Sequence, residues 1–273
     1  MKPILKYPGA KWRIADWIID HMPPHESYVE PYFGSGAIFF NKPPCRIETI
    51  NDMDGEIVNF FRVCREKPLE LARAVYFTPW SREEYMRSFG CDLCNDVERA
   101  RRFAIQCWMT FGAGNTKQRG WRHSTGGKKD GGPDNPKLWG RLPGVIQEVS
   151  ERLLAAQIEN RPALDVIAQF DGDRILLYVD PPYVRSARAT RADAYNHEMT
   201  DADHGELLKA LISHKGMVLL SGYNSDLYQD MLRDWLKVEK STTAESGKRR
   251  TECLWINPWA QERRGMLGME LDA

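Results

Sequence analysis

The sequence predicts an α/β fold, built on an open and mainly parallel sheet with one inserted region. At both ends of the chain, short segments with strand-like patterns alternate with segments of helical spacing, which is typical of strands joined by crossover helices. Residues 175–179 (ILLYV) are apolar throughout, as expected of a central strand buried on both faces. Residues 77–144 lack this alternation, so we predict one domain from residues 1–76 and 145–273 that this segment interrupts.

The elements expected before the insert follow the strand, helix, strand, helix order of a parallel sheet. In order, they are a short alternating strand over 27–32 (SYVEPY), a glycine turn over 33–36, the start of a helix over 37–42 (AIFFNK), a strand over 46–50 and a helix over 55–65. The second strand ends directly at Asn51 and Asp52. Polar side chains are therefore expected at a strand end.

The elements after the insert resume this order. In order, they are a helix over 144–157, a weak strand over 157–160, a helix over 163–169, the strand over 175–179, a helix over 201–213, a strand over 217–221 and a closing pair of strands over 236–241 and 252–256. Within the insert, residues 97–111 have helical spacing. The whole pattern predicts an open sheet of about seven strands and a mostly helical insert.

The composition excludes several classes of protein. The chain has 273 residues, 42% of them hydrophobic, and its 38 Lys and Arg balance its 38 Asp and Glu. These values exclude a disordered, membrane-embedded or collagen-like chain. No apolar segment approaches the roughly 18 residues of a membrane-spanning helix, and the N-terminus lacks the apolar run of a signal peptide. We therefore expect a cytoplasmic protein.

The cysteines are expected to be free thiols, because a reducing cytosol disfavours disulfides. They are scattered along the chain, at Cys45, Cys64, Cys91, Cys94, Cys107 and Cys253. Cys91 and Cys94 form a CxxC pattern, but a structural zinc site needs two further ligands at matching spacing. Neither Cys107 nor His123 supplies them, so we predict no metal site.

A basic segment within the insert indicates contact with a polyanion. Between Lys117 and Arg141, seven basic residues outnumber two acidic ones, which gives a local net charge of +5. Trp121 lies between Arg119 and Arg122, which favours stacking of its ring on a base. We expect Lys117 to contact phosphate and Arg119 or Arg122 to contact a base edge, because the guanidinium fork can make paired hydrogen bonds.

The turn over residues 33–36 (FGSG) and the carboxylate of Asp52 together indicate a nucleoside-containing cofactor. Ligands of open α/β sheets bind at the carboxyl ends of the strands, where both features fall. Gly34 and Gly36 permit a tight turn and a close approach of the backbone to a ligand, and Asp52 suits both hydroxyls of a ribose. A plain turn with a chance pair of glycines is the alternative, since short glycine patterns are weak signals.

Residues 180–183 (DPPY) follow the central strand directly and predict a site for an amino group. Pro181 and Pro182 fix the backbone and remove two N–H donors, which leaves the Asp180 carboxylate and the Pro181 carbonyl as acceptors. An exocyclic amino group held by both would have its lone pair drawn out of ring conjugation and aimed at an electrophilic methyl carbon. Tyr183 adds a flat face for a planar base. In a plain proline-rich loop, Asp180 would lack a partner.

Several motifs together resemble a known family of enzymes. They are LKYPGAKWR over 5–13, EPYFGSGAIFF over 30–40, ND at 51 and 52, and YVDPPY over 178–183. The chain resembles the Dam-like family of S-adenosylmethionine-dependent DNA adenine methyltransferases, over nearly its whole length and in the family's motif order. The resemblance implies a Rossmann-like methyltransferase sheet and identifies the insert, residues 77–144, as a target-recognition region.

The resemblance also implies roles for individual residues. Tyr7 and Lys11 approach the cofactor, with Lys11 near the target pocket. Glu30, Phe33, Gly34, Ser35 and Gly36 surround its methionine part, and Asp52 takes the ribose hydroxyls. Asp180, Pro181, Pro182 and Tyr183 hold the flipped adenine, with Asp180 also counted among the residues at the cofactor.

The chain departs from the family pattern at two places. Ala10 stands where the family usually has a second glycine, a small change that keeps the role of Lys11. Around Pro162 the family often has an acidic residue for the cofactor adenine, and here Asp165 is only a weak substitute. The contact to the cofactor adenine is therefore left unassigned.

The predicted function is transfer of a methyl group from S-adenosylmethionine to the 6-amino group of a flipped adenine in double-stranded DNA. We expect a monomer that needs no metal and contacts no membrane. If the basic insert does not bind DNA, Arg185, Arg188 and Arg191, which follow the DPPY turn, are the next candidates.

Three alternatives remain at this stage. The same acceptors would fit the 4-amino group of cytosine, although the motif order and KYPGAK favour adenine. A nicotinamide oxidoreductase could use the glycine turn, but it requires Gly or Ala at the position of Phe39. A catalytically silent DNA-binding protein is disfavoured by the intact DPPY motif.

Overall fold

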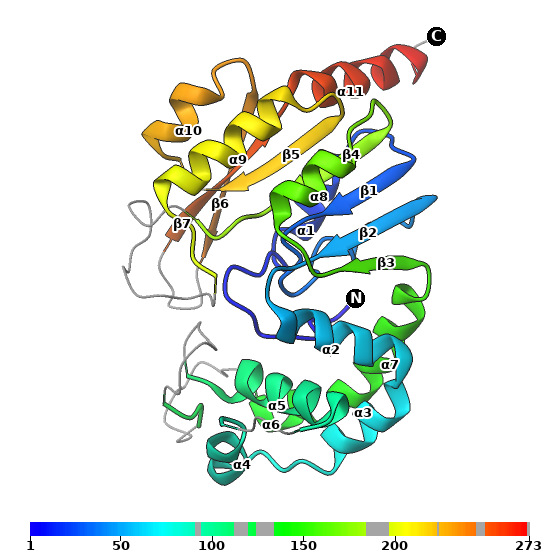
Figure 1. Cartoon of the computed structure of the whole chain (residues 1–273), viewed down its shortest axis with the longest axis vertical. Helices are drawn as coiled ribbons and strands as arrows, with labels where there is room; N and C mark the ends of the chain where they lie inside the picture. The colour runs from blue at the N-terminus through cyan, green and yellow to red at the C-terminus, as the bar shows by residue number, and fades with distance from the viewer. Residues whose placement is uncertain are drawn as a thin grey trace.

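The structure, a computed structural model, describes residues 1–90, 94–111, 120–123, 134–183, 197–222, 224–243 and 249–271. In this part of the chain seven strands form one sheet, in the order β3-β2-β1-β4-β5-β7-β6 (Figure 1). The strands are β1 (Ser27–Glu30), β2 (Ile47–Asn51), β3 (Ala156–Glu159), β4 (Ile175–Val179), β5 (Met217–Gly222), β6 (Leu236–Thr243) and β7 (Arg249–Ile256). The predicted α/β sheet and its number of strands are confirmed.

The direction of the strands gathers the predicted motifs at one edge. β1 pairs in parallel with β2 on one side and with β4 on the other, and β3 and β5 extend this parallel part outward. The carboxyl ends of β1, β2 and β4 therefore lie side by side. β7 runs antiparallel to both β5 and β6 and lies between them.

Alternate residues of the strands enter separate cores on the two faces of the sheet. Tyr28 and Tyr178 belong to one core, and their neighbours Val29 and Val179 belong to the other. The same alternation separates Leu219 from its neighbours in β5. This burial on both faces explains why the central strands have continuous apolar sequences.

The helices form two groups around the sheet (Figure 1). α8 (Ala163–Gln169), α9 (Asp201–Ser213) and α10 (Asp226–Met231) cover one face and share its core. The other helices contribute to the second core and are α1 (Ala15–Ile19), α2 (Gly55–Glu66), α3 (Pro68–Tyr76), α4 (Arg82–Arg87), α5 (Asp96–Met109), α6 (Asn135–Trp139), α7 (Leu142–Leu153) and α11 (Pro258–Leu271). Figure 1 places α2 to α7 together at one end of the molecule and α11 at the opposite end. None of the helices in the described residues is long and apolar enough to cross a bilayer.

The helices of the predicted insert pack onto those that flank it. Phe103 of α5 lies 6.0 Å from the ring of Phe60 in α2, and Trp108 of α5 lies 6.4 Å from Trp139 of α6. The indole of Trp108 also donates to the carbonyl of Ile4 (2.9 Å). Helices α4 to α6 therefore share one core with α2, α3 and α7.

Residues 37–42 form turns and not the predicted helix. The amide of Phe40 donates to the Gly36 carbonyl (3.0 Å) and that of Lys42 to the Ile38 carbonyl (2.9 Å), so about one helical turn is made. Pro43 and Pro44 follow, and a proline disfavours helical geometry in the residue before it. The prediction failed because these prolines outweigh the local apolar spacing.

A second prediction, that all the cysteines are free thiols, also differs from the structure. Cys45, Cys64, Cys107 and Cys253 are thiols, as expected, but Cys94 is disulfide-bonded. The expectation of free thiols throughout the chain is therefore wrong at the CxxC pattern.

Candidate active site

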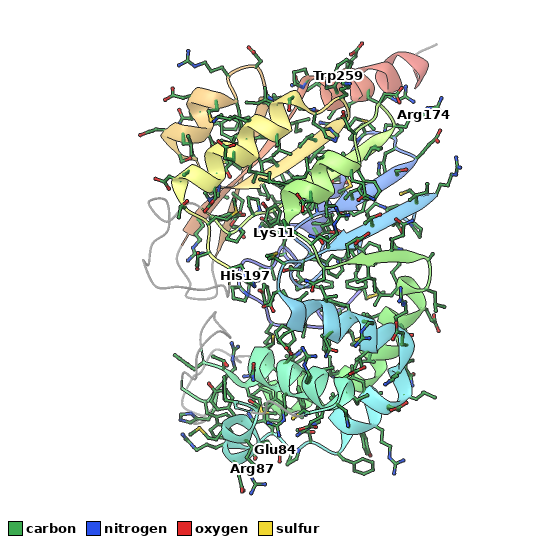
Figure 2. All side chains as sticks on the ribbon, in the orientation of Figure 1. Lys11, Glu84, Arg87, Arg174, His197 and Trp259 are labelled. Atoms are coloured by element: carbon green, nitrogen blue, oxygen red, sulfur yellow. The ribbon has the colours of Figure 1, made fainter. Side chains whose placement is uncertain are left out.

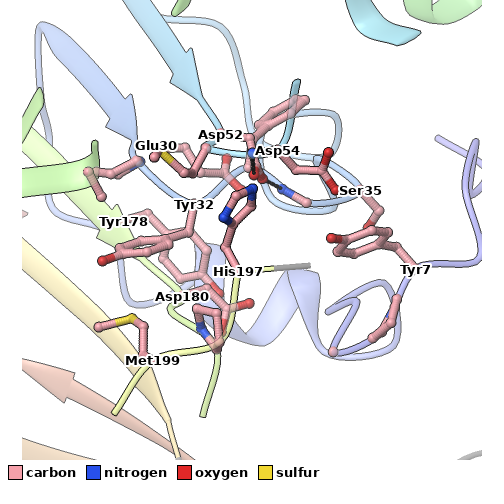
Figure 3. Close-up of a pocket in the computed structure, with 18 of the residues that line it drawn as sticks. Tyr7, Glu30, Tyr32, Ser35, Asp52, Asp54, Tyr178, Asp180, His197 and Met199 are labelled. Atoms are coloured by element: carbon pink, nitrogen blue, oxygen red, sulfur yellow. Dashed lines mark hydrogen bonds between the residues drawn. The ribbon is translucent and has the colours of Figure 1, made fainter. Parts of the chain in front are cut away.

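A cavity of about 450 Å³ opens where β1, β2 and β4 end. Figure 3 shows side chains from these strand ends, from the N-terminal segment and from the residues before α9 around it. Most of the predicted cofactor residues line it, namely Tyr7, Lys11, Glu30, Phe33, Gly34, Ser35, Asp52 and Asp180. The structure thus brings together motifs that lie far apart in the sequence.

The glycine turn needs its glycines for geometric reasons. Gly34 and Gly36 have φ values of +52° and +67°, in the left-handed region that side chains disfavour. A Cβ on Gly36 would lie 2.5 Å from ring atoms of Phe33 and Phe40. The absence of a side chain at Gly36 therefore lets the turn pack directly against these two rings.

Asp52 connects the end of β2 to this turn. Its carboxylate accepts hydrogen bonds from the amides of Gly34 (2.8 Å) and Asp54 (2.9 Å). Burial nevertheless raises the pKa of Asp52 to about 7, and the nearby Asp54 adds to this rise. The two backbone amides thus hold this carboxyl group at the end of β2, beside the glycine turn.

Asn51, the residue before Asp52, connects the ends of β1, β2 and β3. Its side-chain amide donates to the carbonyls of Pro31 (2.9 Å) and Arg161 (3.1 Å) and accepts from the Arg161 amide (2.9 Å). The side chain is almost fully buried. The sequence analysis gave this residue no role, because its partners follow β1 and β3 and leave no local pattern.

Glu30 is a buried carboxyl at the end of β1. It accepts a hydrogen bond from the hydroxyl of Tyr28 (2.7 Å). Burial raises the pKa of Glu30 to about 8, the Tyr28 bond opposes this rise, and Asp180 adds to it. Near neutral pH this carboxyl therefore carries a proton that a cationic ligand could displace.

Asp180, at the end of β4, pairs with a cation from the N-terminal segment. The ammonium of Lys11 lies 2.8 Å from Asp180 Oδ2, donates to the Gly9 carbonyl at 2.7 Å and lies 4.7 Å from the centre of the Tyr183 ring. Burial raises the pKa of Asp180, and Lys11 opposes this rise. In the described part of the chain, the buried Oδ1 atom of Asp180 has no hydrogen-bond partner.

The rest of the DPPY turn lies beside this pair. Pro182 lines the cavity, and Pro181 and Tyr183 are buried. The hydroxyl of Tyr183 donates to Glu252 Oε2 of β7 at 2.7 Å. Glu252 is a residue of the site that the sequence analysis missed.

Other lining residues were also not predicted. The largest group belongs to β4, to the loops after the strands and to the first turns of α8 and α9, and consists of Tyr32, Met53, Asp54, Pro162, Ala163, Leu164, Tyr178, His197, Glu198, Met199, Asp203, Glu206 and Leu207. The described residues contain no group of three or more His, Cys, Asp or Glu side chains placed to hold a metal.

Two of the predicted nucleic-acid residues are described. Trp121 is half-buried, with the Arg82 guanidinium 4.9 Å from its ring centre and His123 stacked on it. Arg122 donates from Nε to the Thr110 carbonyl (2.9 Å). The other predicted residues, Lys117, Arg119, Arg185, Arg188 and the reserve candidate Arg191, lie outside the described residues.

Figure 2 shows where two of the residues that line the cavity lie in the whole molecule. Figure 2 places Lys11 and His197 near the line where the sheet meets the helices, with Glu84 and Arg87 at the far end of the helices. Arg174 and Trp259 lie at the opposite end, beyond the sheet (Figure 2). The residues that line the cavity all belong to residues 7–54 and 162–207, and none of them comes from the described helices α2 to α7.

Comparisons with known proteins agree over most of the chain. A family model described as D12 class N6 adenine-specific DNA methyltransferase matches residues 7–246. The Type II methyltransferase M1.LlaDCHI of Lactococcus lactis subsp. cremoris is 27% identical over 89% of this chain and 89% of its own. The DNA adenine methylase of Escherichia coli (strain K12) is 22% identical over 91% of this chain and 92% of its own. Among solved structures, a conserved hypothetical protein of Streptococcus pyogenes is 9% identical over 91% of this chain and 95% of its own, with a TM-score of 0.38.

Proposed function

The chain belongs to the D12 class of N6 adenine-specific DNA methyltransferases, and on this premise we propose that its cavity holds S-adenosylmethionine next to a flipped adenine of double-stranded DNA. The protein is an enzyme that methylates adenine in DNA. The family excludes the nicotinamide oxidoreductase and favours adenine over cytosine. The observation that carries the proposal is Asp180, whose buried Oδ1 atom has no partner in the described part of the chain.

The cavity fits S-adenosylmethionine, which supplies a methyl group on a positively charged sulfonium. Glu30, Asp52 and Asp180 place carboxyl groups along its wall, and carboxylates attract a cation in a site of low dielectric. Glu30 and the turn over 33–36 hold the methionine part, and Asp52 accepts hydrogen bonds from the ribose hydroxyls. Residues 162–164 supply apolar surface for the adenine ring of the cofactor.

The DPPY turn receives the target adenine. The Asp180 carboxylate and the Pro181 carbonyl accept the two N–H groups of the 6-amino group, and Tyr183 stacks on the base. The nitrogen lone pair would bond to the methyl carbon that the cofactor supplies, and the cofactor would leave with the electrons of the broken bond. The Asp180 carboxylate would stabilise the positive charge on the nitrogen until a proton is lost to solvent.

Lys11 favours the ionised form of the Asp180 carboxyl, which can accept hydrogen bonds through both oxygens. Its ammonium offsets part of the rise in the Asp180 pKa that burial causes. A protonated carboxyl would offer one acceptor fewer to the amino group. Lys11 therefore acts on the ionisation of Asp180, and Asp180 contacts the base.

DNA contact is assigned to residues 77–144 and to the segment after the DPPY turn. Trp121 and Arg122 are residues at the start of the basic segment that the structure describes. An isolated β-bridge between Thr110 and Trp121 connects them to the end of α5. The net charge of +5 between Lys117 and Arg141 suits a polyanion. We infer that this region recognises the target sequence and that Arg185 and Arg188 contact DNA near the flipped base.

One experiment tests the proposal. The purified protein is incubated with methyl-labelled S-adenosylmethionine and duplex DNA, and the DNA is digested to nucleosides. Label in N6-methyldeoxyadenosine is the expected result. Label in N4-methyldeoxycytidine would overturn the choice of base, and absence of labelled nucleoside with intact cofactor binding would indicate the silent DNA-binding alternative.

A further inference from the structure

We propose that Glu252 is a positioning residue for methyl transfer, which fixes the ring of Tyr183 through the hydrogen bond between them. The inference rests on the proposed function, in which Tyr183 stacks on the target base. Glu252 itself acts through Tyr183, and no contact of Glu252 with the base or the cofactor is needed. Its position in β7, at the other end of the sequence from the N-terminal motifs, gives the C-terminal hairpin a part in the reaction.

The contact is short and buried at both ends. The Tyr183 hydroxyl donates to Glu252 Oε2 at 2.7 Å across 69 residues of sequence, and both side chains are about 8% exposed. A hydrogen bond to a charged acceptor is stronger than one between neutral groups, above all where water is excluded. This bond therefore links the catalytic turn to the middle of β7.

The turn has particular need of a side-chain anchor. Pro181 and Pro182 have no amide hydrogen, so neither can donate a backbone hydrogen bond to the neighbouring strands. Asp180 is held through its side chain by Lys11. The Tyr183 hydroxyl is the corresponding anchor at the other end of the turn, and it limits rotation of the ring.

The bond also has an electrostatic effect on the ring. Burial, Asp180 and Glu252 hold the pKa of Tyr183 well above its usual value, so the phenol remains a donor. A carboxylate that attracts the phenolic proton makes the ring more electron-rich, and such a face attracts a cation more strongly. Lys11 already lies 4.7 Å from the ring centre. The amino nitrogen, positively charged during transfer, would benefit from the same face.

The test is a double-mutant cycle measured on duplex DNA. Glu252→Ala should lower kcat by ten- to a hundredfold, the loss expected for a charged hydrogen bond, with the KM for cofactor within about twofold of wild type. Tyr183→Phe keeps the ring and should lose at least a similar factor, because it also removes the hydrogen bond between the Tyr183 hydroxyl and Asp180. In the Tyr183→Phe background, Glu252→Ala should cause little further loss, because the bond that gives Glu252 its positioning role is already absent.

Two further variants separate a positioning role from a structural one. Glu252→Gln keeps the shape and an acceptor oxygen, so it should recover part of the rate lost in Glu252→Ala and should fold even if the alanine variant does not. Glu239→Ala is the matched control: it removes a half-exposed carboxylate of β6 that pairs with Lys237 and faces Cys253, the neighbour of Glu252. It should leave kcat unchanged.

The outcomes are distinct. A wild-type kcat in Glu252→Ala, or losses that multiply independently in the double variant, would overturn the proposal. If Glu252→Ala does not fold, the cycle of Glu252→Gln with Tyr183→Phe decides by the same criterion. A failure of the proposed function itself would be seen in the wild-type protein, as absence of labelled N6-methyladenine, before any variant is compared.

Discussion

The ammonium of Lys11 lies 2.8 Å from Oδ2 of Asp180, so an N-terminal residue and the end of the central strand β4 form one charged pair. The same ammonium faces the ring of Tyr183. The pair leaves Oδ1 of Asp180 without a partner among the described residues. One carboxylate thus combines an oxygen fixed by Lys11 with a buried oxygen that has no hydrogen-bond partner among the described residues.

Asp180→Ala should reduce methyl transfer by roughly two or more orders of magnitude, because it removes one of the two acceptors that orient the amino group. The rate of label transfer to duplex DNA under single-turnover conditions measures the effect. Asp173→Ala is a suitable control, since Asp173 is exposed before β4 begins. Turnover near the wild-type value in Asp180→Ala would rule out the mechanism.

Lys11→Met should move the acidic limb of the kcat profile to higher pH. Burial raises the pKa of Asp180 and Lys11 opposes this rise, so loss of the cation lets the pKa rise further and leaves less of the ionised acceptor at a given pH. The profile is measured between pH 5 and 9 beside Lys2→Met, which removes an exposed lysine. A limb that stays in place, or moves to lower pH, would contradict the assigned role.

Asp52→Ala should weaken binding of S-adenosylmethionine and leave DNA affinity nearly unchanged, because the assigned ribose contact concerns only the cofactor. Titration calorimetry with cofactor and a separate DNA-binding titration measure the two affinities. In the wild type, cofactor binding should also strengthen as the pH rises through about 7, where Asp52 ionises. Unchanged cofactor affinity in the variant would remove Asp52 from the site.

The same pKa predicts a pH-dependent stability. The pKa of Asp52 is about 7 in the folded state, against an ordinary value of 3.8. The folded state thus holds a proton that the unfolded state loses first, and stability falls as the pH rises from about 4 to about 7. In Asp52→Asn this part of the fall should vanish, as measured by urea unfolding at several pH values. An equally steep fall in the variant would refute the assignment.

Gly36→Ala should destabilise the protein by about 1–3 kcal/mol, since an alanine there has a positive φ and too little space. Its Cβ would lie 2.5 Å from the rings of Phe33 and Phe40. Gly144→Ala is the control, because Gly144 lies in helix α7 and its Cβ would meet nothing within 4 Å. That variant should gain up to about 1 kcal/mol. Chemical denaturation of both proteins decides the prediction, which fails if the two changes are equal.

Substitutions in the basic segment should separate phosphate contacts from base contacts. Lys117→Ala should lower DNA affinity for all sequences and reduce the salt slope by about one unit. Arg119→Ala or Arg122→Ala should instead relax the preference at one position of the recognition sequence, at a cost of about 1–3 kcal/mol. Binding titrations at several salt concentrations measure both. Unchanged affinity and slope in all three variants would move the DNA to Arg185, Arg188 and Arg191.

Elements whose pattern reflects burial were predicted to the residue. Helix 163–169, strand 175–179 and helix 201–213 have the predicted bounds, because their apolar positions face a core on one or both sides. Helices such as α1 and α6 have five residues each, which is too few for a helical period to be visible. At 37–42 the apolar spacing was visible but the prolines that follow prevented a helix.

The site was predictable wherever a motif is continuous in sequence. The turn over 33–36, Asp52 and the turn over 180–183 all reach one cavity, as the strand-end rule requires. The partners of these motifs were not predictable. Glu252 meets Tyr183 across 69 residues, and Asn51 meets Arg161 across 110, and neither contact leaves a local pattern.

The position of β7 has a consequence for synthesis of the chain. β7 lies between β5 and β6 but is translated after both, so a growing polypeptide leaves the β5 edge without its neighbour until residues 249–256 emerge from the ribosome. An unpaired edge strand invites pairing with other chains. Glu252 belongs to the same strand. A chain truncated before β7 would therefore lack the hydrogen-bond partner of Tyr183 and would also expose the β5 edge, which favours aggregation. Pairing of β7 with β5 thus covers this edge and brings Glu252 to Tyr183 in the same step.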